Sequence, residues 1–298
     1  MMLKLANPFS GIDSPIKEYE PLAAHTWFKI GGPARWYLQP RNIEELQQAA
    51  ARCTEANIPI YVLGLGANLL VSDDGVDGAV FRLDADAFRS VIVRSSSLDV
   101  GAGMDIQKLV LRTVRVGLAG IECLAGIPGS VGGAIRMNAG GKFGDIGTAI
   151  SAVTVMDTEG QIYERTRDDL LFDYRRTNIT AKFILGATLD LEEQDPHQIL
   201  NRTKEIWMYK RNTQPLNNKS AGCIFKNANG TSAGLLIDQA GLKGMKVGGA
   251  QISTKHANFI IAHPGCLADD VLRLIKLVRE KVHAHHGIDL ESEVQIWT

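Results

Sequence analysis

Long apolar runs, paired cysteines and an excess of one charge are all missing from this chain of 298 residues. No apolar stretch reaches the ~18 residues that a membrane helix needs, because Asn68 interrupts the best candidate, near residues 60–71. The first 14 residues hold no apolar signal-peptide core. With 32 Lys and Arg against 33 Asp and Glu, the basic excess of nucleic-acid binders and membrane-tethered proteins is absent. We therefore expect a soluble, cytoplasmic protein that binds neither nucleic acid nor membrane.

Metal and disulfide signatures are also missing. The four cysteines are far apart and form no CxxC pair, which argues against a disulfide framework or a zinc site. His283, His285 and His286 cluster in the last turn of a predicted helix, where imidazoles favour the helix dipole without any metal. We expect no metal.

Glycine, in contrast, is abundant. It supplies 30 of the 298 residues, about a tenth of the chain, whereas about 7% is typical of soluble proteins. A first tract, Gly64–Leu69, follows a predicted buried strand and begins like a dinucleotide-binding motif. Leu69 stands where the third glycine belongs, and residues 71–80 hold too many turn formers for the required helix. The sequence therefore excludes a Rossmann motif. Glycines flanking Asn68 still suit a backbone that approaches a pyrophosphate closely.

A second tract covers residues 120–141. Its glycines alternate with Ile, Leu, Val and Ala, so we expect it to be buried and not a mobile linker. Buried backbone N–H groups must find partners. Two interpretations remain open: a bound anionic ligand, which we favour, or tight turns packed on themselves.

Apolar periodicity and capping residues predict a mixed chain with a composition shift near residue 195. We expect an irregular arm over the first 20 residues. Helices are predicted over residues 43–56, 106–116, 196–211, 235–240 and 269–286. Strands are predicted over residues 60–63, 152–156, 161–164, 183–191, 247–252, 259–261 and 288–297. The last strand would place Glu291 and Glu293 on one face.

Six motifs occur in a fixed order along nearly the whole chain: residues 26–32, 63–69, 126–140, 174–177, 221–227 and 290–294. This series resembles the UDP-N-acetylenolpyruvoylglucosamine reductases, flavoenzymes of peptidoglycan precursor synthesis. The chain has no tyrosine-bearing insertion after Arg175. In this respect it resembles the shorter subclass of that family. A non-catalytic nucleotide-sugar sensor on the same fold, or another FAD oxidase or dehydrogenase, remains an alternative.

The resemblance implies an α+β fold with two FAD-binding subdomains of the vanillyl-alcohol-oxidase (PCMH) type and a C-terminal α+β substrate domain. The expected division is an arm over residues 1–20, FAD-binding subdomains over 21–82 and 83–194, and the UDP-sugar domain over 195–298. It also implies non-covalent FAD, NADPH as co-substrate, and a monomer.

The implied reaction is that of a UDP-N-acetylmuramate dehydrogenase. Hydride passes from NADPH through FAD to carbon 3 of the enolpyruvyl group, and carbon 2 takes a proton. The added charge lies beside a carboxylate, so the site must stabilise an enolate. Arg175 and Glu293 match the family's catalytic arginine and glutamate, and a like charge on Glu291 would raise one carboxyl pKa. From the residues alone, two alternatives remain open. Arg175 could form a structural ion pair, and Glu291 and Glu293 could lie on a solvated strand edge.

Cys223 occupies the position where the family usually has the serine that protonates carbon 2. A thiol, with an ordinary pKa of about 8.5, is a far stronger acid than an alcohol. The alternative is a small buried apolar residue.

The resemblance also implies binding residues. Those for FAD are Ile30, Gly31, Gly32, Gly64, Leu65, Gly66, Ala67, Asn68, Leu69, Gly126, Pro128, Gly129, Ser130, Gly132, Gly133, Ala134, Asn138, Ala139 and Gly140. For the UDP phosphates, the polar and basic residues of the C-terminal domain suited to a diphosphate are Lys210, Arg211, Lys226, Asn227 and Gln251. Tyr174 is expected to contact the substrate or to position Arg175.

Overall fold

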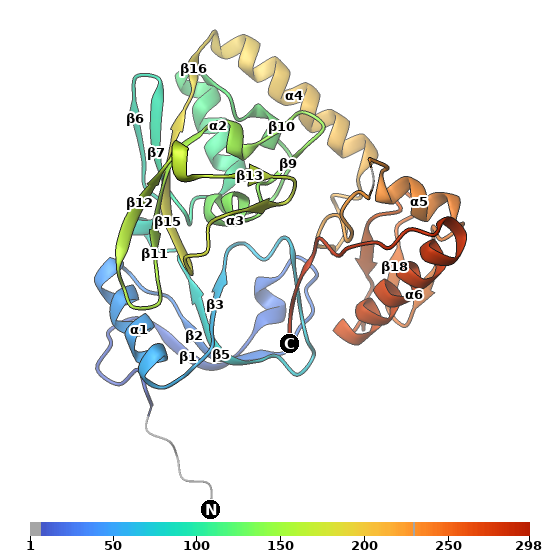
Figure 1. Cartoon of the computed structure of the whole chain (residues 1–298), viewed down its shortest axis with the longest axis horizontal. Helices are drawn as coiled ribbons and strands as arrows, with labels where there is room; N and C mark the ends of the chain where they lie inside the picture. The colour runs from blue at the N-terminus through green and yellow to red at the C-terminus, as the bar shows by residue number, and fades with distance from the viewer. Residues whose placement is uncertain (1–6, 229) are drawn as a thin grey trace, which may run out of the picture. The chain divides into compact units, whose positions relative to one another are not determined.

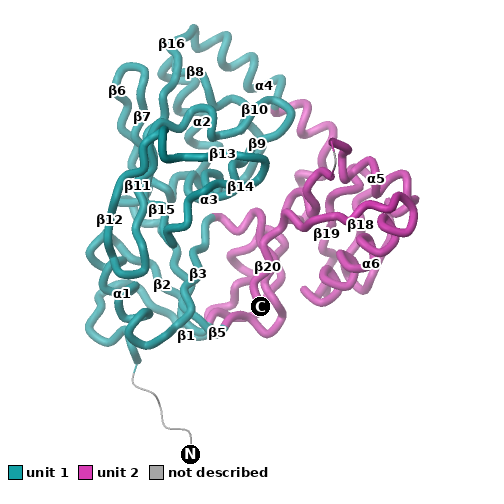
Figure 2. Tube along the Cα trace, in the orientation of Figure 1, with its two compact units in different colours: residues 1–19, 35–64, 77–206 teal, residues 20–34, 65–76, 207–298 magenta. Residues whose placement is uncertain are grey.

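The computed structural model describes residues 7–228 and 230–298, which fall into two compact units (Figure 2). Unit 1 contains the residues up to 19 together with 35–64 and 77–206. Unit 2 contains residues 20–34, 65–76 and 207–298. The division falls inside helix α4 (Pro196–Thr213), and two short segments from the first quarter of the chain belong to the unit with the C-terminal part. The subdomain limits expected from the sequence stay a prediction.

Unit 1 is built on two sheets (Figure 1). The first has the order β1 (Ile16–Pro21), β2 (Pro33–Leu38), β5 (Val76–Arg82), β3 (Ile60–Leu63). The second has the order β12 (Ile162–Thr166), β11 (Ile150–Met156), β15 (Phe183–Asp190), β7 (Ser97–Gly101), β6 (Val91–Arg94). Two-stranded pairs are β9 (Gly140–Gly141) with β10 (Gly144–Asp145), β13 (Phe172–Asp173) with β14 (Arg176–Thr177), and β16 (Glu192–Glu193) with β8 (Leu118–Ala119).

Three helices complete unit 1: α1 (Ile43–Glu55), α2 (Ile106–Val116) and α3 (Val131–Arg136). The predicted start of α1 is confirmed, because the Asn42 side chain accepts a hydrogen bond from the Glu45 N–H. α2 begins at the predicted cap Asp105 and ends at Gly117, whose φ of 75° is the left-handed conformation that glycine favours. Apolar residues of α2 and α3 share one core with the inner face of β11 and β15.

Unit 2 holds the strand order β17 (Lys246–Val247), β18 (Ala250–Ile252), β19 (Ile260–Ala262), with helices α5 (Ala233–Gln239) and α6 (Ala268–His286). Its core includes Phe28 and Leu70, both 0% exposed, although they lie far upstream in the sequence. No helix among the described residues has the length and apolar character needed to cross a membrane.

Three secondary-structure predictions were wrong in extent. Residues 16–20, expected in the irregular arm, belong to β1, which lies beside β2; residues 1–6 of that arm lie outside the described part. The single strand expected over 247–252 is a hairpin, because Gly248 turns the chain at φ 51°. The last strand is only β20 (Gln295–Trp297), because the residues before it bond to a distant loop.

Residues 65–76, which we call the strap, attach an early part of the chain to unit 2. Within the strap, β4 (Leu69–Val71) pairs in parallel with β20, and Leu70 lies opposite Ile296. The Gly32 N–H donates to the Ser72 carbonyl at 2.7 Å. A side chain at Gly32 would collide with the Asp73 carbonyl oxygen, so only glycine permits this approach.

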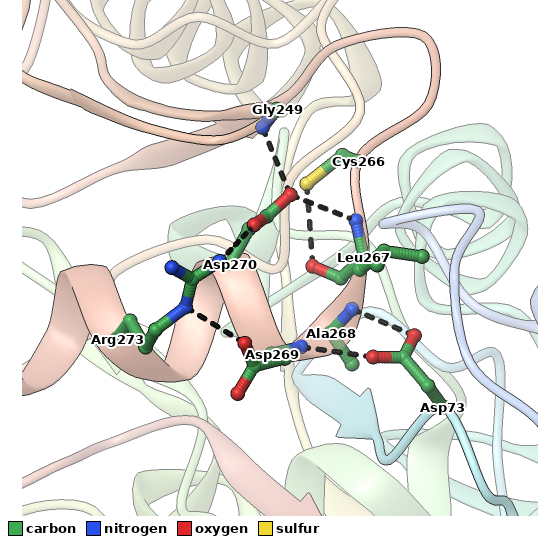
Figure 3. A network of polar contacts seen from close by, with 8 residues as sticks. All are labelled: Asp73, Gly249, Cys266, Leu267, Ala268, Asp269, Asp270 and Arg273. Carbon is green, nitrogen blue, oxygen red and sulfur yellow. Dashed lines mark hydrogen bonds and ion pairs between the residues drawn. The ribbon is translucent and has the colours of Figure 1, made fainter.

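The far end of the strap caps helix α6 (Figure 3). The two Asp73 carboxylate oxygens accept hydrogen bonds from the Ala268 N–H at 2.8 Å and the Asp269 N–H at 3.0 Å. The neighbouring Asp270 carboxylate accepts from the Gly249 and Leu267 N–H groups, and these bonds lower its pKa. An acidic side chain thus satisfies N–H groups that the first turn of a helix leaves without partners.

We expect Asp73→Ala to destabilise the protein by ~1 kcal/mol, the usual effect of losing a helix cap. The measurement is the midpoint of thermal unfolding. Asp74→Ala is the matched control, because it removes the adjacent exposed carboxylate without touching α6. Equal midpoints for the two variants would contradict the capping role.

Candidate functional site

In unit 1 the second glycine tract folds into turns that lead into helix α3. The tract is buried only in part: apolar members such as Ile121 and Val131 are buried, whereas its glycines are half-buried or exposed, so the expectation of a fully buried tract was wrong. Ser130 caps α3 by accepting from the Gly133 N–H at 3.3 Å. Several N–H groups bond inside the protein, such as Val131 to the Met104 carbonyl and Gly132 to the Ala102 carbonyl. Self-packed turns therefore account for part of this backbone.

The rest of the tract has the features of a ligand cradle. A Cβ at Gly64 would lie 2.5 Å from the Ser130 Oγ, so the first tract approaches the start of α3 with no room for a side chain. At Gly129, with φ at 150°, a Cβ would meet no atom within 4 Å. Backbone that is close-packed on one side and uncovered on the other is accessible to a phosphate, and these residues therefore fit a dinucleotide cofactor.

Arg175 lies at the tip of the hairpin formed by β13 and β14. Its φ is 56°, its guanidinium donates to the Gly140 carbonyl at 2.9 Å, and it stacks over the Tyr174 ring at 5.1 Å. Asn138, 4% exposed, accepts from the Gly147 N–H and donates to the carbonyl of Asp173, the last residue of β13 before the turn. The structure thus places the predicted catalytic arginine directly beside the glycine tract.

Cys223 and Glu293 come together in unit 2. The Glu293 N–H donates to the carbonyl of Ile224, the residue after Cys223, at 2.7 Å. The Lys226 N–H donates to the Glu291 carbonyl at 2.8 Å. These two bonds join segments that are about 70 positions apart in the sequence.

The strap also holds Glu293. The Asn68 side-chain amide donates to the Glu293 carbonyl at 3.1 Å, and the Gln295 N–H donates to the Asn68 carbonyl at 3.1 Å. Glu291, which we expected to act on Glu293 as a like charge, forms an ion pair with Lys226 at 2.5 Å instead. That cation offsets the charge of Glu291.

Comparison with known proteins gives the family. Residues 34–166 match the family described as FAD binding domain, and residues 214–297 match the family described as UDP-N-acetylenolpyruvoylglucosamine reductase, C-terminal domain. The reductase of Anoxybacillus flavithermus is 37% identical over 94% of each chain. That of Syntrophobacter fumaroxidans is 41% identical over 95% of this chain and 84% of its own. The chain belongs to the UDP-N-acetylenolpyruvoylglucosamine reductase family.

Solved structures agree with this assignment to the reductase family. The reductase of Thermus caldophilus superimposes with a TM-score of 0.83 and 38% identity, over 96% of this chain and 99% of its own. A cholesterol oxidase from B. sterolicum gives a TM-score of 0.50 at 16% identity over 65% of this chain and 40% of its own, which shows a shared fold alone. The predicted α+β fold, with an FAD-binding part and a C-terminal reductase domain, is confirmed.

The other substrate residues predicted for this reductase lie on several elements. Asn227 is in the Cys223 segment, and its Oδ1 accepts from the Ala233 N–H at 3.0 Å at the start of α5. Lys210 is buried near the end of α4, and Arg211 stacks over Trp207 at 5.1 Å. Gln251, on β18, bonds to the Gly244 carbonyl and to His263. Lys226 and Asn227 thus share a segment with Cys223, whereas the other three are on separate elements of the chain.

Sequence reasoning missed Asn258, which binds the backbone of the Cys223 segment. Its only signal is a single amide in the otherwise apolar run over residues 257–262. Among residues 7–228 and 230–298, no three His, Cys, Asp or Glu side chains gather as metal ligands would. His283 and His286 bond to Asp289 and to the Leu236 carbonyl.

Proposed function

We propose that this chain reduces the enolpyruvyl group of a UDP-sugar with NADPH, giving UDP-N-acetylmuramate. Its relatives are named as reductases of UDP-N-acetylenolpyruvoylglucosamine. Membership of the reductase family over nearly the whole chain supports this reaction. The observation that carries it is the bond from the Glu293 N–H to the Ile224 carbonyl, because it joins the two family motifs that hold an acid and a proton donor.

Bound FAD would supply the redox chemistry, in which hydride from NADPH is passed to carbon 3 of the enolpyruvyl group. In this proposal the glycine tracts around Gly64, Gly129 and Gly140 hold the cofactor through their backbone. Close-packed glycine next to uncovered glycine supports that assignment. The remaining residues predicted for FAD, from Ile30 to Ala139, are proposed on the family motifs.

The protein's own side chains handle the charge and the proton. Adding hydride to carbon 3 moves the double-bond electrons onto carbon 2 and its carboxylate as an enolate. We assign Arg175 and the Glu293 carboxyl to stabilise that enolate, the first as a cation and the second as a hydrogen-bond donor. The Cys223 thiol then gives its proton to carbon 2 and is reprotonated from water. The net reaction consumes one NADPH and one proton.

Lys210, Arg211, Lys226, Asn227 and Gln251 are proposed to bind the UDP part, and Tyr174 to contact the sugar or orient Arg175. The stacking of Tyr174 under the guanidinium supports the second of these. Because NADPH and nucleotide-linked sugars are intracellular metabolites, we place the reaction in the cytoplasm. A monomeric state stays a prediction.

The flavin absorbance of the purified protein tests the function directly. We expect a yellow protein whose visible flavin band bleaches with NADPH under anaerobic conditions and returns when the enolpyruvyl UDP-sugar is added. Return of the band with oxygen only would contradict the reductase and favour another flavin oxidase. A protein that binds the sugar but does not bleach would be a sensor.

A further inference from the structure

A single buried amide, that of Asn258, bonds to both polar groups of one residue in the Cys223 segment. Asn258 is 3% exposed and lies two residues before β19. Its Oδ1 accepts from the Phe225 N–H at 2.9 Å, and its Nδ2 donates to the Phe225 carbonyl at 2.8 Å. The side chain therefore pairs with the Phe225 backbone through one donor and one acceptor, as the backbone of a neighbouring strand would.

The backbone around this contact explains why a side chain is needed there. The Ile224 N–H donates to the Asn258 carbonyl at 2.9 Å, while the Ile224 carbonyl accepts from the Glu293 N–H. Ile224 is a bend between the isolated bridges at Cys223 and Phe225, so the chain does not continue as a regular strand. The Asn258 amide completes the pairing where the backbone ladder stops.

Asparagine has the chemistry that this contact requires. Its amide offers a donor and an acceptor together, whereas an aspartate offers acceptors only and leucine offers neither. A buried N–H or carbonyl that loses its partner costs about 1–3 kcal/mol. An aspartate would also place a carboxylate oxygen against the Phe225 carbonyl.

We propose that Asn258 is a positioning residue for the reduction step: by fixing the Phe225 backbone, it holds Cys223 and Glu293 in their relative places. This inference rests on the proposed function. The enolate and the proton donor must meet at one carbon, and a misplacement of about 1 Å in such a geometry slows a reaction by ~10²-fold. Reduction of the flavin by NADPH requires neither Cys223 nor Glu293, so Asn258 should affect only the second half of the reaction.

Stopped-flow measurement of both half-reactions in Asn258→Asp tests the proposal. We expect reoxidation by the enolpyruvyl UDP-sugar to slow by ~10- to 100-fold, while reduction by NADPH changes by less than about threefold. Hydrogen exchange of the Phe225 amide gives a readout that does not depend on turnover, and we expect it to accelerate in Asn258→Leu, which removes the acceptor of the Phe225 N–H.

Ser253→Ala is the matched control. Ser253 is 2% exposed in the same loop, and its hydroxyl accepts from the N–H groups of Lys255 and His256, in its own turn. Its loss also removes buried hydrogen bonds, yet we expect both half-reactions to stay near the parent rates. Equal slowing of both half-reactions in Asn258→Asp, or the same pattern in Ser253→Ala, would overturn the positioning role.

Two further outcomes remain informative. If Asn258→Asp does not fold, Asn258→Ser, which removes the amide without adding a charge, is read by the same criteria. If the parent protein is reduced by NADPH but never reoxidised by the sugar, the proposed function fails. The exchange rate of the Phe225 amide then still decides whether Asn258 holds the segment.

Discussion

Cys223→Ala should still oxidise NADPH at the flavin but should stall before product. Removing the group that protonates carbon 2 is expected to slow reoxidation of the flavin by ~10²–10⁴-fold, the range for loss of a general acid. Flavin reduction precedes that step and should keep its rate. Stopped-flow absorbance with the two substrates added in sequence separates these effects.

Two matched variants sharpen the test. Cys223→Ser restores a hydroxyl donor at the same place and should remain active. Cys266→Ala removes a thiol elsewhere in unit 2, one whose pKa burial raises to about 11, and should turn over at the parent rate. Normal turnover in Cys223→Ala would refute the assignment of Cys223 as proton donor.

The isolated fragment 207–298 should fail to fold. It contains the C-terminal reductase domain but lacks Phe28 and Leu70, both fully buried in the core of unit 2. It also lacks β4, the partner of β20, and the Asp73 cap of α6. Circular dichroism on heating should show no cooperative transition, whereas the full chain should show one.

A pair of leucine variants in the full chain tests, without deleting any segment, how far the stability of unit 2 depends on the strap. Leu70→Ala is expected to destabilise the protein by ~2–5 kcal/mol, as other fully buried leucines do. Leu235→Ala, at a position in the same unit that is 50% exposed, should have little effect. A stable fragment together with a harmless Leu70→Ala would show that the strap is dispensable for unit 2.

Local patterns predicted much of this fold because they depend on neighbours in the sequence. The Asn42 and Asp105 caps, the Gly117 stop and the apolar faces of α2 and α6 are all encoded within one or two helical turns. The failure of the first glycine tract to match a Rossmann motif was likewise readable from Leu69 and from the turn residues that follow.

Long-range pairing was not readable in the same way. The last strand was overestimated because residues 288–294 alternate like a strand but bond to the Cys223 segment and to Asn68. The partner of Glu291 is Lys226, 65 positions away, and no local pattern specifies it. Asn258 acts through one residue 33 positions upstream, and its chemistry appears only when the two segments are adjacent.

The strap has a thermodynamic consequence for ligand binding. Its first residues, 65–69, belong to the tract that we assign to FAD, and its remainder is bonded to the C-terminal part of unit 2. A ligand that binds only the folded form adds RT ln(1 + [L]/Kd) to stability, about 2.7 kcal/mol at a hundredfold excess over Kd. Because the strap is bonded to the segment that carries Glu293, cofactor binding that stabilises the strap should also stabilise that segment. Apoprotein and holoprotein should differ in the rigidity of the acid as well as in colour.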